Sequence, residues 1–327
     1  MKKRIKVVIP AAGEGRRLKP HTHTTPKPLL SVAGKPIIGH IMERVKELEP
    51  EEVIIIIAPN GSPIEKYLKE NFSMNFRFVI QEEPKGLGEA VYKAKPYFKD
   101  EPCLIILGDT IIDMPLNNLL GEENWIGVKR VEDPKRFGIV EVKDGIITKI
   151  VEKPAEPKSN LAIVGIYYIF QSSFLFNALE KIIKENIKTK GEYQLSDALE
   201  LMIEENINFR TCPVEYWLDC GTPEALIQTN RYLLQNTNYF KPRPNSLIIP
   251  PVYIHDSALL ENSIIGPFVS ISEEVEVRNS IIKDSIINQG SYIENSLLEN
   301  SILGENSIVK EKPLRLNLGS FSIFEIS

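Results

Sequence analysis

A glycine-rich turn carrying two arginines follows the first apolar stretch of the chain. The segment Gly13 to Arg17 reads Gly-Glu-Gly-Arg-Arg and comes shortly after the apolar run from Ile5 to Ile9. Glycines after a strand let backbone N–H groups approach a polyphosphate, and arginine adds a fork of donors. The turn lacks both the P-loop pattern and the third glycine of a dinucleotide fingerprint. Taken alone, it fits either a phosphate site or a structural turn with solvated arginines.

A carboxylate follows another apolar run, Leu104 to Leu107, at Asp109. Open α/β sheets form their ligand crevices at the carboxyl ends of strands, so an acidic residue at this place indicates a site. Mg²⁺ prefers oxygen ligands and bridges phosphates, which makes it the cation that this carboxylate suits. A cap on a following helix is the alternative interpretation.

The elements that position these residues alternate between strand and helix patterns. Continuous apolar runs predict strands covered on both faces; they lie at 5–9, 53–57, 76–80 and 104–107. Helix-period segments lie between them, at 37–48, 63–70 and 88–97. Such alternation predicts an α/β fold with a doubly wound, mostly parallel sheet.

The pattern loosens after Gly121. Strands are expected at 125–128, 138–142, 146–151 and 163–170, and helices at 173–185, 196–205 and 223–235. The last helix begins after Gly221-Thr222-Pro223, which supplies a cap and a first-turn proline.

The composition changes near Lys241 to Asn245, which reads as a linker between a domain at 1–240 and another at 241–327. A unit of a polar residue, serine and two aliphatic residues then occurs six times, from Asn262 to Val309. Paired units recur after sixteen residues. This repeat predicts about three coils of a β-helix with strands of five or six residues. An ordinary antiparallel sheet is the alternative.

Charge and hydropathy exclude several classes of protein. The formal net charge is −5, which argues against a surface that coats nucleic acid. No apolar run approaches the roughly 18 residues that span a bilayer, and no signal peptide is recognisable. Cys103, Cys212 and Cys220 lie in apolar stretches without a disulfide spacing, so buried free thiols are expected. We therefore expect a soluble, cytoplasmic protein without nucleic-acid or membrane partners.

The glycine-rich turn continues into a longer signature, Leu18-x-Pro20-x-Thr22-x-x-x-Pro26-Lys27-Pro28-Leu29. This segment resembles the signature of the sugar-1-phosphate nucleotidyltransferases, the family of glucose-1-phosphate thymidylyltransferase. The resemblance covers residues 4 to about 235, and longer relatives also carry C-terminal repeats. It implies a Rossmann-like catalytic domain followed by a short left-handed parallel β-helix.

The resemblance assigns the nucleotide side of a site. It implies catalytic roles for Arg17, Lys27 and Asp109. The residues it places around the nucleotide are Ala11, Ala12, Gly13, Gly15, Gln81, Gly86 and Asp109. In Trp217 to Thr222 it supplies a second carboxylate, Asp219, so that Asp109 and Asp219 would hold Mg²⁺. Two aspartates 110 positions apart share a metal only if the fold brings them together. Asp219 also fits a helix cap, and the segment of Gln81 also fits a simple loop.

The resemblance likewise assigns a sugar-phosphate side. It names Gly138, Glu152, Lys153, Asn160, Gly165 and Tyr167. Glu152 would accept sugar hydroxyls and Lys153 would hold the phosphate. Phe137 stands where the family often has tyrosine, a departure that concerns mainly packing.

The expected reaction joins a nucleoside triphosphate to a sugar-1-phosphate in a homo-oligomeric enzyme. We expect dTTP with glucose-1-phosphate first, and UTP as the alternative, because one methyl group contributes only about 1–3 kcal/mol to discrimination. Two rivals are an additional acetyl transfer by the repeats, where His255 is the only histidine, and a non-catalytic regulatory homologue. The latter would be expected to lose Arg17, Lys27 or an aspartate, and all are present.

Overall fold

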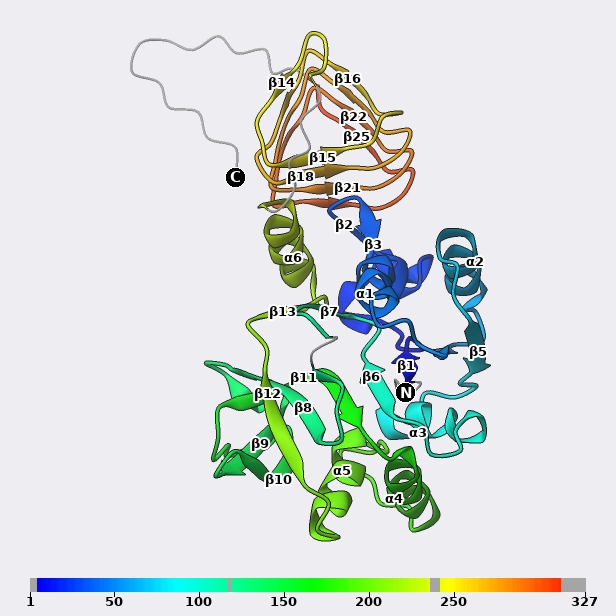
Figure 1. The fold of residues 1–327 in the computed structure, drawn as a ribbon. Coiled ribbons are helices and arrows are strands. Elements are labelled where there is room, and N and C mark those ends of the chain that lie inside the picture. Colours follow the sequence, from blue (N-terminus) through cyan, green and yellow to red (C-terminus); the bar gives the residue numbers. More distant parts are fainter. Residues whose placement is uncertain (1–4, 117–118, 236–241, 313–327) are drawn as a thin grey trace. The chain divides into compact units, whose positions relative to one another are not determined.

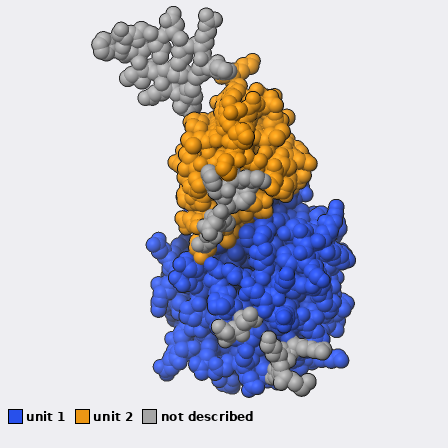
Figure 2. Space-filling model, turned by 45° about the horizontal axis from the view of Figure 1, so that its top comes forward, with its two compact units in different colours: residues 1–31, 35–229 blue, residues 32–34, 230–327 orange. Residues whose placement is uncertain are grey.

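The computed structural model describes residues 5–116, 119–235 and 242–312 (Figure 1). The chain divides into two compact units, one of residues 1–31 and 35–229 and one of residues 32–34 and 230–327 (Figure 2). The division falls inside a helix, after Thr229. The boundary predicted from the sequence, between residues 240 and 241, lies outside the described residues and stays a prediction.

The first unit is built on one nine-stranded sheet. Its strands, in spatial order, are β5 (Phe76–Ile80), β4 (Glu52–Ile57), β1 (Lys6–Pro10), β6 (Cys103–Ile106), β11 (Leu161–Ile169), β8 (Asn124–Arg130), β12 (Phe209–Pro213), β10 (Ile146–Glu152) and β9 (Gly138–Lys143). All residues of β4 and β6 are buried, which confirms that these strands are covered on both faces.

The sheet is mostly parallel in strand direction, as predicted, but it is mixed, because β10 and β11 run against the other strands. Strands β5, β4, β1 and β6 are parallel, but β11 runs antiparallel to both β6 and β8. The β9–β10 connection shows one reason. Asp144 and Gly145 have positive φ angles of 52° and 79°, and a tight turn of this kind joins only antiparallel strands.

The predicted helices are present with small shifts at their ends. They are α1 (Ile37–Lys46), α2 (Ser62–Asn71), α3 (Leu87–Tyr92), α4 (Ser172–Lys184), α5 (Leu195–Glu204) and α6 (Pro223–Gln235). The expected helix at 88–97 is shorter; after Tyr92 the chain resumes helical geometry only as a 3₁₀ turn, Lys95–Tyr97. Pro96 cannot donate an N–H to a continuing α-helix. None of the described helices has the length and hydropathy needed to cross a membrane.

A small two-stranded ribbon lies outside the main sheet and was not predicted. Strand β7 (Thr110–Asp113) pairs antiparallel with β13 (Tyr216–Asp219). Two further two-residue strands, β2 (Ser31–Val32) and β3 (Lys35–Pro36), pair with each other. The three cysteines are buried and free, as expected.

The second unit contains three parallel sheets of four strands each, in the arrangement that a β-helix requires. The sheets are β14 (Leu247–Ile248), β17 (Ile264–Ile265), β20 (Ile281–Lys283) and β23 (Leu297–Glu299); β15 (Val252–Ile254), β18 (Val269–Ile271), β21 (Ile286–Ile287) and β24 (Ile302–Leu303); and β16 (Leu259–Glu261), β19 (Glu276–Arg278), β22 (Tyr292–Glu294) and β25 (Ile308–Lys310). We call this arrangement the three-sheet coil. It has four turns rather than about three, and its strands have two or three residues rather than five or six. The left-handedness implied by the resemblance stays a prediction.

The repeated polar-serine-aliphatic unit has a physical explanation in this coil. Asn279 and Asn295 have φ angles of 47° and 53°, a left-handed conformation that asparagine tolerates at corners. The hydroxyl of the following serine bonds to the neighbouring turn; Ser296 N donates to Ser280 Oγ over 3.1 Å. The aliphatic residues fill the interior, where Ile282 is fully buried.

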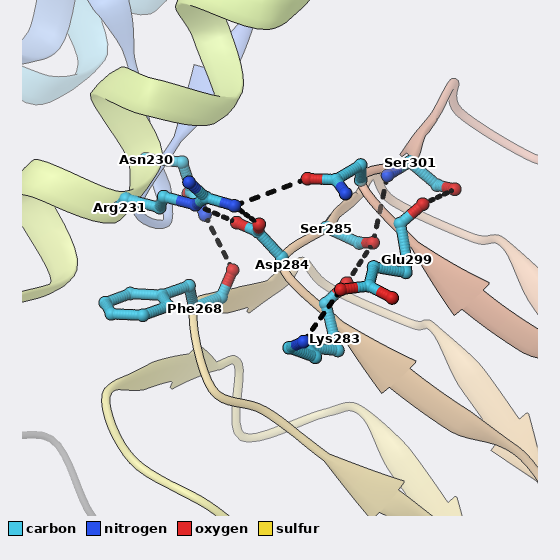
Figure 3. Close-up of polar contacts among 9 residues, drawn as sticks. Asn230, Arg231, Phe268, Lys283, Asp284, Ser285, Glu299 and Ser301 are labelled. Carbon is cyan, nitrogen blue, oxygen red and sulfur yellow. Dashed lines mark hydrogen bonds and ion pairs between the residues drawn. The ribbon is translucent and has the colours of Figure 1, made fainter.

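The end of α6 is bonded to this coil within the second unit (Figure 3). Asn230 is fully buried, and its Oδ1 accepts hydrogen bonds from Ala33 N and Ser270 Oγ at 2.8 and 2.6 Å. Arg231 forms an ion pair with Asp284, whose side chain is only 2% exposed. Asp284 occupies a corner position that asparagine holds elsewhere in the repeat.

Candidate active site

A first cavity of about 410 Å³ lies at the carboxyl ends of β1 and β6. All the residues predicted around the nucleotide line it: Ala11, Ala12, Gly13, Gly15, Gln81, Gly86 and Asp109. Gly15 has a φ of 63°, and a Cβ there would come within 2.8 Å of Thr22 Cγ2. The glycine therefore both permits the turn and keeps its backbone close to the cavity.

Lys27 lines the same cavity from a short 3₁₀ turn, Lys27–Leu29. The residue is buried, and its Nζ forms an ion pair with Asp109 Oδ2. Lys27 thus places one positive charge beside the carboxylate at the end of β6. The structure therefore brings together Lys27 and Asp109, two of the residues predicted to be catalytic.

Gln81 and Gly86 form one wall of the first cavity. Gln81 is buried, and its Nε2 donates to Glu89 Oε2 over 2.6 Å and to Gly86 O over 3.3 Å. Gly86 has a φ of 117°, and a Cβ there would lie 2.5 Å from Tyr193 O. Since the amide nitrogen of Gln81 is already engaged, its carbonyl oxygen is the side-chain atom left to meet a ligand. Glu89, which orients that amide, was not found from the sequence.

A second cavity of about 630 Å³ shares Leu87, Leu107, Asp109 and Glu192 with the first. Its lining includes five of the six residues predicted on the sugar side: Gly138, Glu152, Lys153, Gly165 and Tyr167. Arg17 and Asp219 line it as well. Arg17 was predicted to bind the triphosphate. It lines the second cavity, however, and not the first.

Asn160 is the predicted sugar-side residue that does not line the second cavity. It lines a separate surface hollow, where its Oδ1 accepts a hydrogen bond from Arg130 Nη1 over 2.9 Å. The same residue also accepts from Val131 N through its backbone oxygen. Asn160 therefore connects neighbouring chain segments away from the cavity.

Glu152 and Lys153 stand together at the end of β10. Glu152 Oε2 accepts from Ser196 Oγ over 2.9 Å, and its Oε1 lies 3.4 Å from Lys153 Nζ. A Cβ at Gly138 would lie 3.0 Å from Glu152 Oε2, so the glycine leaves that carboxylate accessible beside β9. Burial raises the pKa of the nearby Tyr167 phenol, and the Glu152 and Asp109 carboxylates raise it further. The tyrosine is therefore a neutral hydroxyl that can donate a hydrogen bond.

The β7–β13 ribbon brings the two predicted metal-binding aspartates together. Asp219 pairs with Thr110, and Cys220 N donates to Asp109 O over 3.1 Å. The pKa of Asp219 is raised, first by burial and then by the negative charge of Asp109; Lys27 and the arginines of the cavity lower it in part. The helix-cap alternative for Asp219 is not supported, because Thr222 Oγ1 accepts from Ala225 N at the start of α6.

Two partly buried carboxylates, one of which raises the pKa of the other, fit a divalent cation. The part of the chain that the structure describes has no cluster of three or more His, Cys, Asp or Glu able to hold a metal. Mg²⁺ does not require one, because it is usually bound by one or two carboxylates and completed by water and substrate phosphates.

Four further residues of the second cavity were not singled out from the sequence: Arg136, Glu192, Ser196 and Trp217. Trp217 packs edge-on against Phe137 with ring centroids 4.9 Å apart. Its Nε1 is buried without a hydrogen-bond partner among the described residues. Glu192 and Ser196 lie in the segment Gly191 to Asp197, which also resembles a block of the sugar-1-phosphate nucleotidyltransferases, and this resemblance is the signal by which the sequence could have indicated them.

The chain belongs to the nucleotidyl transferase family, whose profile matches residues 6–236. It is 37% identical over 232 residues to the bifunctional protein GlmU of Methanocaldococcus jannaschii, covering 71% of this chain and 55% of that protein. It is 27% identical over 322 residues to a glucose-1-phosphate thymidylyltransferase of Streptomyces griseus, covering 88% of each chain. A crystal structure of UDP-glucose pyrophosphorylase complexed with UDP-glucose is 25% identical, with a TM-score of 0.62 over 72% of this chain and all of that one.

The share of each relative that this chain matches differs between the relatives. The chain spans between about half and three fifths of the GlmU proteins that it matches. The match with the Streptomyces griseus protein extends past the family region into the residues of the three-sheet coil.

Proposed function

We propose that this protein transfers a nucleotidyl group from a nucleoside triphosphate to a sugar-1-phosphate and releases pyrophosphate. The observation that carries the proposal is the pair of cavities that share Asp109. One is walled by the glycine-rich turn and Lys27, and the other by Glu152 and Lys153. Such a pair suits a reaction in which two phosphorylated substrates meet at one carboxylate.

The residues support a single in-line displacement. The attacking phosphate oxygen is already an anion, so the reaction needs no general base. Catalysis then consists of positioning and of neutralising charge on the α-phosphate and on the departing pyrophosphate. Lys27 from the first cavity and Arg17 and Lys153 from the second supply positive charge on both sides of Asp109.

We propose Mg²⁺ as the cofactor, held by Asp109 and Asp219. When bound, the ion would neutralise phosphate charge and act as a Lewis acid on the substrate. The two carboxylates support this assignment, because the charge of Asp109 raises the cost of ionising Asp219 when no metal is bound.

For the substrates, we propose dTTP and glucose-1-phosphate first, with UTP as the alternative. The name of the Streptomyces griseus relative favours the thymidylyl reaction, and the UDP-glucose complex favours the uridylyl reaction. The wall formed by Gln81 and Gly86 would face the base in either case. A contact to one methyl group contributes only about 1–3 kcal/mol, so both triphosphates require testing.

The decisive experiment measures pyrophosphate release from a matrix of nucleoside triphosphates and sugar-1-phosphates with Mg²⁺. We expect release from at least one pair containing dTTP or UTP and glucose-1-phosphate. Asp109→Asn serves as the control for contaminating activity. A protein that binds nucleotide-sugar but releases no pyrophosphate from any pair is the regulatory homologue instead.

We also propose that the protein is a cytoplasmic homo-oligomer. Buried free thiols are typical of a reducing compartment. The three-sheet coil presents aliphatic side chains on its surface, with Leu297 69% exposed and Leu259 64% exposed, and such residues favour contacts between copies. Light scattering coupled to gel filtration tests the oligomeric state; a monomeric mass at micromolar concentration would contradict it.

A further inference from the structure

The second cavity is lined by more acidic than basic side chains, although its proposed substrate is an anion. Its acidic lining residues are Asp109, Glu152, Glu192 and Asp219, and its basic ones are Arg17, Arg136 and Lys153. The carboxylates therefore outnumber the cations before any phosphate arrives. A sugar-1-phosphate adds up to two more negative charges, so each cation that faces it matters for binding.

Arg136 is held at this cavity by a short, well-defined turn. It ends the 3₁₀ turn Pro134–Arg136, where Asp133 Oδ1 accepts from Lys135 N over 3.3 Å and Phe137 N donates to Pro134 O over 3.1 Å. The next two residues, Phe137 and Gly138, line the same cavity. The turn that forms the sugar-side wall thus also presents the guanidinium.

The guanidinium lies against an aromatic surface. Its carbon is 6.0 Å from the ring centroid of Phe137, and that ring packs edge-on against Trp217. Contact with an aromatic face orients an arginine without consuming its hydrogen-bond donors. Phe137 stands where the family often has tyrosine. Its ring offers the Arg136 guanidinium an aromatic face and carries no hydroxyl that could occupy the guanidinium's donors.

Arg136 differs from the lysines of the site in having no carboxylate within ion-pair distance among the described residues, although its charge acts on Asp219 from farther away. Lys27 is paired with Asp109, and Lys153 lies 3.4 Å from Glu152. Across residues 5–116, 119–235 and 242–312, the structure gives no ion pair or hydrogen bond to the guanidinium of Arg136. Its planar fork of donors matches a phosphate in two-point contact, which an ammonium group does not reproduce.

We propose that Arg136 binds the phosphate of the sugar-1-phosphate in the second cavity, in addition to Lys153. The proposal rests on the proposed nucleotidyl transfer and names a further substrate-binding residue for it. The predicted ligand chemistry is a phosphomonoester of a hexose, held by the arginine fork on one side and by the Lys153 ammonium on the other.

The test compares Arg136→Gln and Arg136→Lys with Lys135→Gln. Lys135 precedes Arg136 in the same turn, is exposed, and lines none of the cavities described above, so it controls for loss of one positive charge from this turn. Initial rates are measured over a range of glucose-1-phosphate with dTTP or UTP fixed, and then with the two roles reversed. Binding of glucose-1-phosphate and of glucose to each protein without nucleotide is measured by calorimetry.

We expect Arg136→Gln to raise the KM for glucose-1-phosphate about tenfold to a hundredfold, as for the loss of hydrogen bonds between charged partners. The KM for the triphosphate should change by about twofold or less. The KM of Arg136→Lys for glucose-1-phosphate should lie between the values of Arg136→Gln and wild type, because lysine keeps the positive charge but not the fork of donors. Calorimetry should show the same loss for glucose-1-phosphate and none for glucose. Lys135→Gln should behave as wild type.

Three results would overturn the assignment: an unchanged KM for glucose-1-phosphate, equal increases for both substrates, or a fall in kcat alone. Failure of the proposed function would give a different result: the wild-type protein itself would release no pyrophosphate from any pair of substrates. In that case, calorimetry with glucose-1-phosphate still decides whether Arg136 binds the phosphate.

Discussion

Asp219 stands opposite Thr110 in the β7–β13 ribbon, so the charge of Asp109, the residue before Thr110, raises the pKa of the Asp219 carboxyl. Asp109 lies in the short connection after β6, a central strand of the sheet, whereas Asp219 ends β13, which leads into α6. The two carboxylates are far apart in the sequence, and only the tertiary structure brings them together. The ribbon is therefore the element on which a shared metal site depends.

The first prediction concerns that shared metal site. Asp109→Asn and Asp219→Asn should each lower the rate of pyrophosphate release roughly 10²–10³-fold, a loss typical of removing a group that stabilises transition-state charge. Asp219→Asn should in addition require a higher Mg²⁺ concentration for half-maximal rate. EDTA should abolish activity in the wild type, and added Mg²⁺ should restore it. Full activity in EDTA would exclude the metal assignment.

The second prediction concerns pH and follows from the raised pKa of Asp219. A carboxyl group whose pKa is higher in the folded than in the unfolded state favours folding while it is protonated. Its contribution is therefore present at acid pH and is lost as the pH rises through the raised pKa. Each pKa unit corresponds to about 1.4 kcal/mol.

The measurement is the free energy of unfolding of metal-free wild type and Asp219→Asn between pH 4 and pH 7, in steps of about half a unit. As the pH rises, wild type should lose stability relative to the variant, since only wild type must ionise a carboxyl beside Asp109. A constant difference across the range would contradict the raised pKa. Mg²⁺ should diminish the effect in wild type.

Much of the fold was predictable because burial leaves a local pattern. Strands β4 and β6 are continuous apolar runs, and continuous runs indicate strands covered on both faces. Strand direction has no such local signal, so the antiparallel course of β11 was missed. The ribbon was missed as well, because β7 and β13 have four residues each and pair residues more than 100 positions apart.

Site residues that belong to a sequence motif could be predicted. Site residues that only the tertiary structure brings to the cavity could not. Gly15 and Lys27 belong to one continuous signature. Arg136 lies in a polar turn and looks, from the sequence, like any surface arginine. Asn160 shows the opposite case, since the resemblance marked it for the sugar side, but its side chain accepts from Arg130 outside the second cavity.

The third prediction concerns Lys27. Lys27→Met should lower kcat roughly 10²–10³-fold, because it removes the buried cation of the first cavity. Lys35→Met is the matched control, since Lys35 pairs with Glu43 at the surface, where an ion pair contributes about 0–1 kcal/mol. The control should keep its rate. Comparable rates for the two variants would remove Lys27 from the catalytic machinery.

The fourth prediction concerns the ion pair between Arg231 and Asp284 within the second unit. Arg231→Met should destabilise the three-sheet coil by about 3–5 kcal/mol, because it leaves the buried carboxylate of Asp284 without its cation. Lys283→Met is the control. Lys283 pairs with Glu299 through side chains that are both about half exposed, so its loss should cost about 0–1 kcal/mol.

A double-mutant cycle distinguishes this ion pair from simple packing. Asp284→Asn restores the residue that the repeat carries at equivalent corners and removes the buried charge, so Arg231→Met with Asp284→Asn should be more stable than Arg231→Met alone. Chemical denaturation followed by circular dichroism gives the four free energies of unfolding. Additive losses would mean that Arg231 contributes through its aliphatic stem and not through the charge of Asp284. A coupling of several kcal/mol would instead show why this one corner of the coil carries aspartate in place of asparagine.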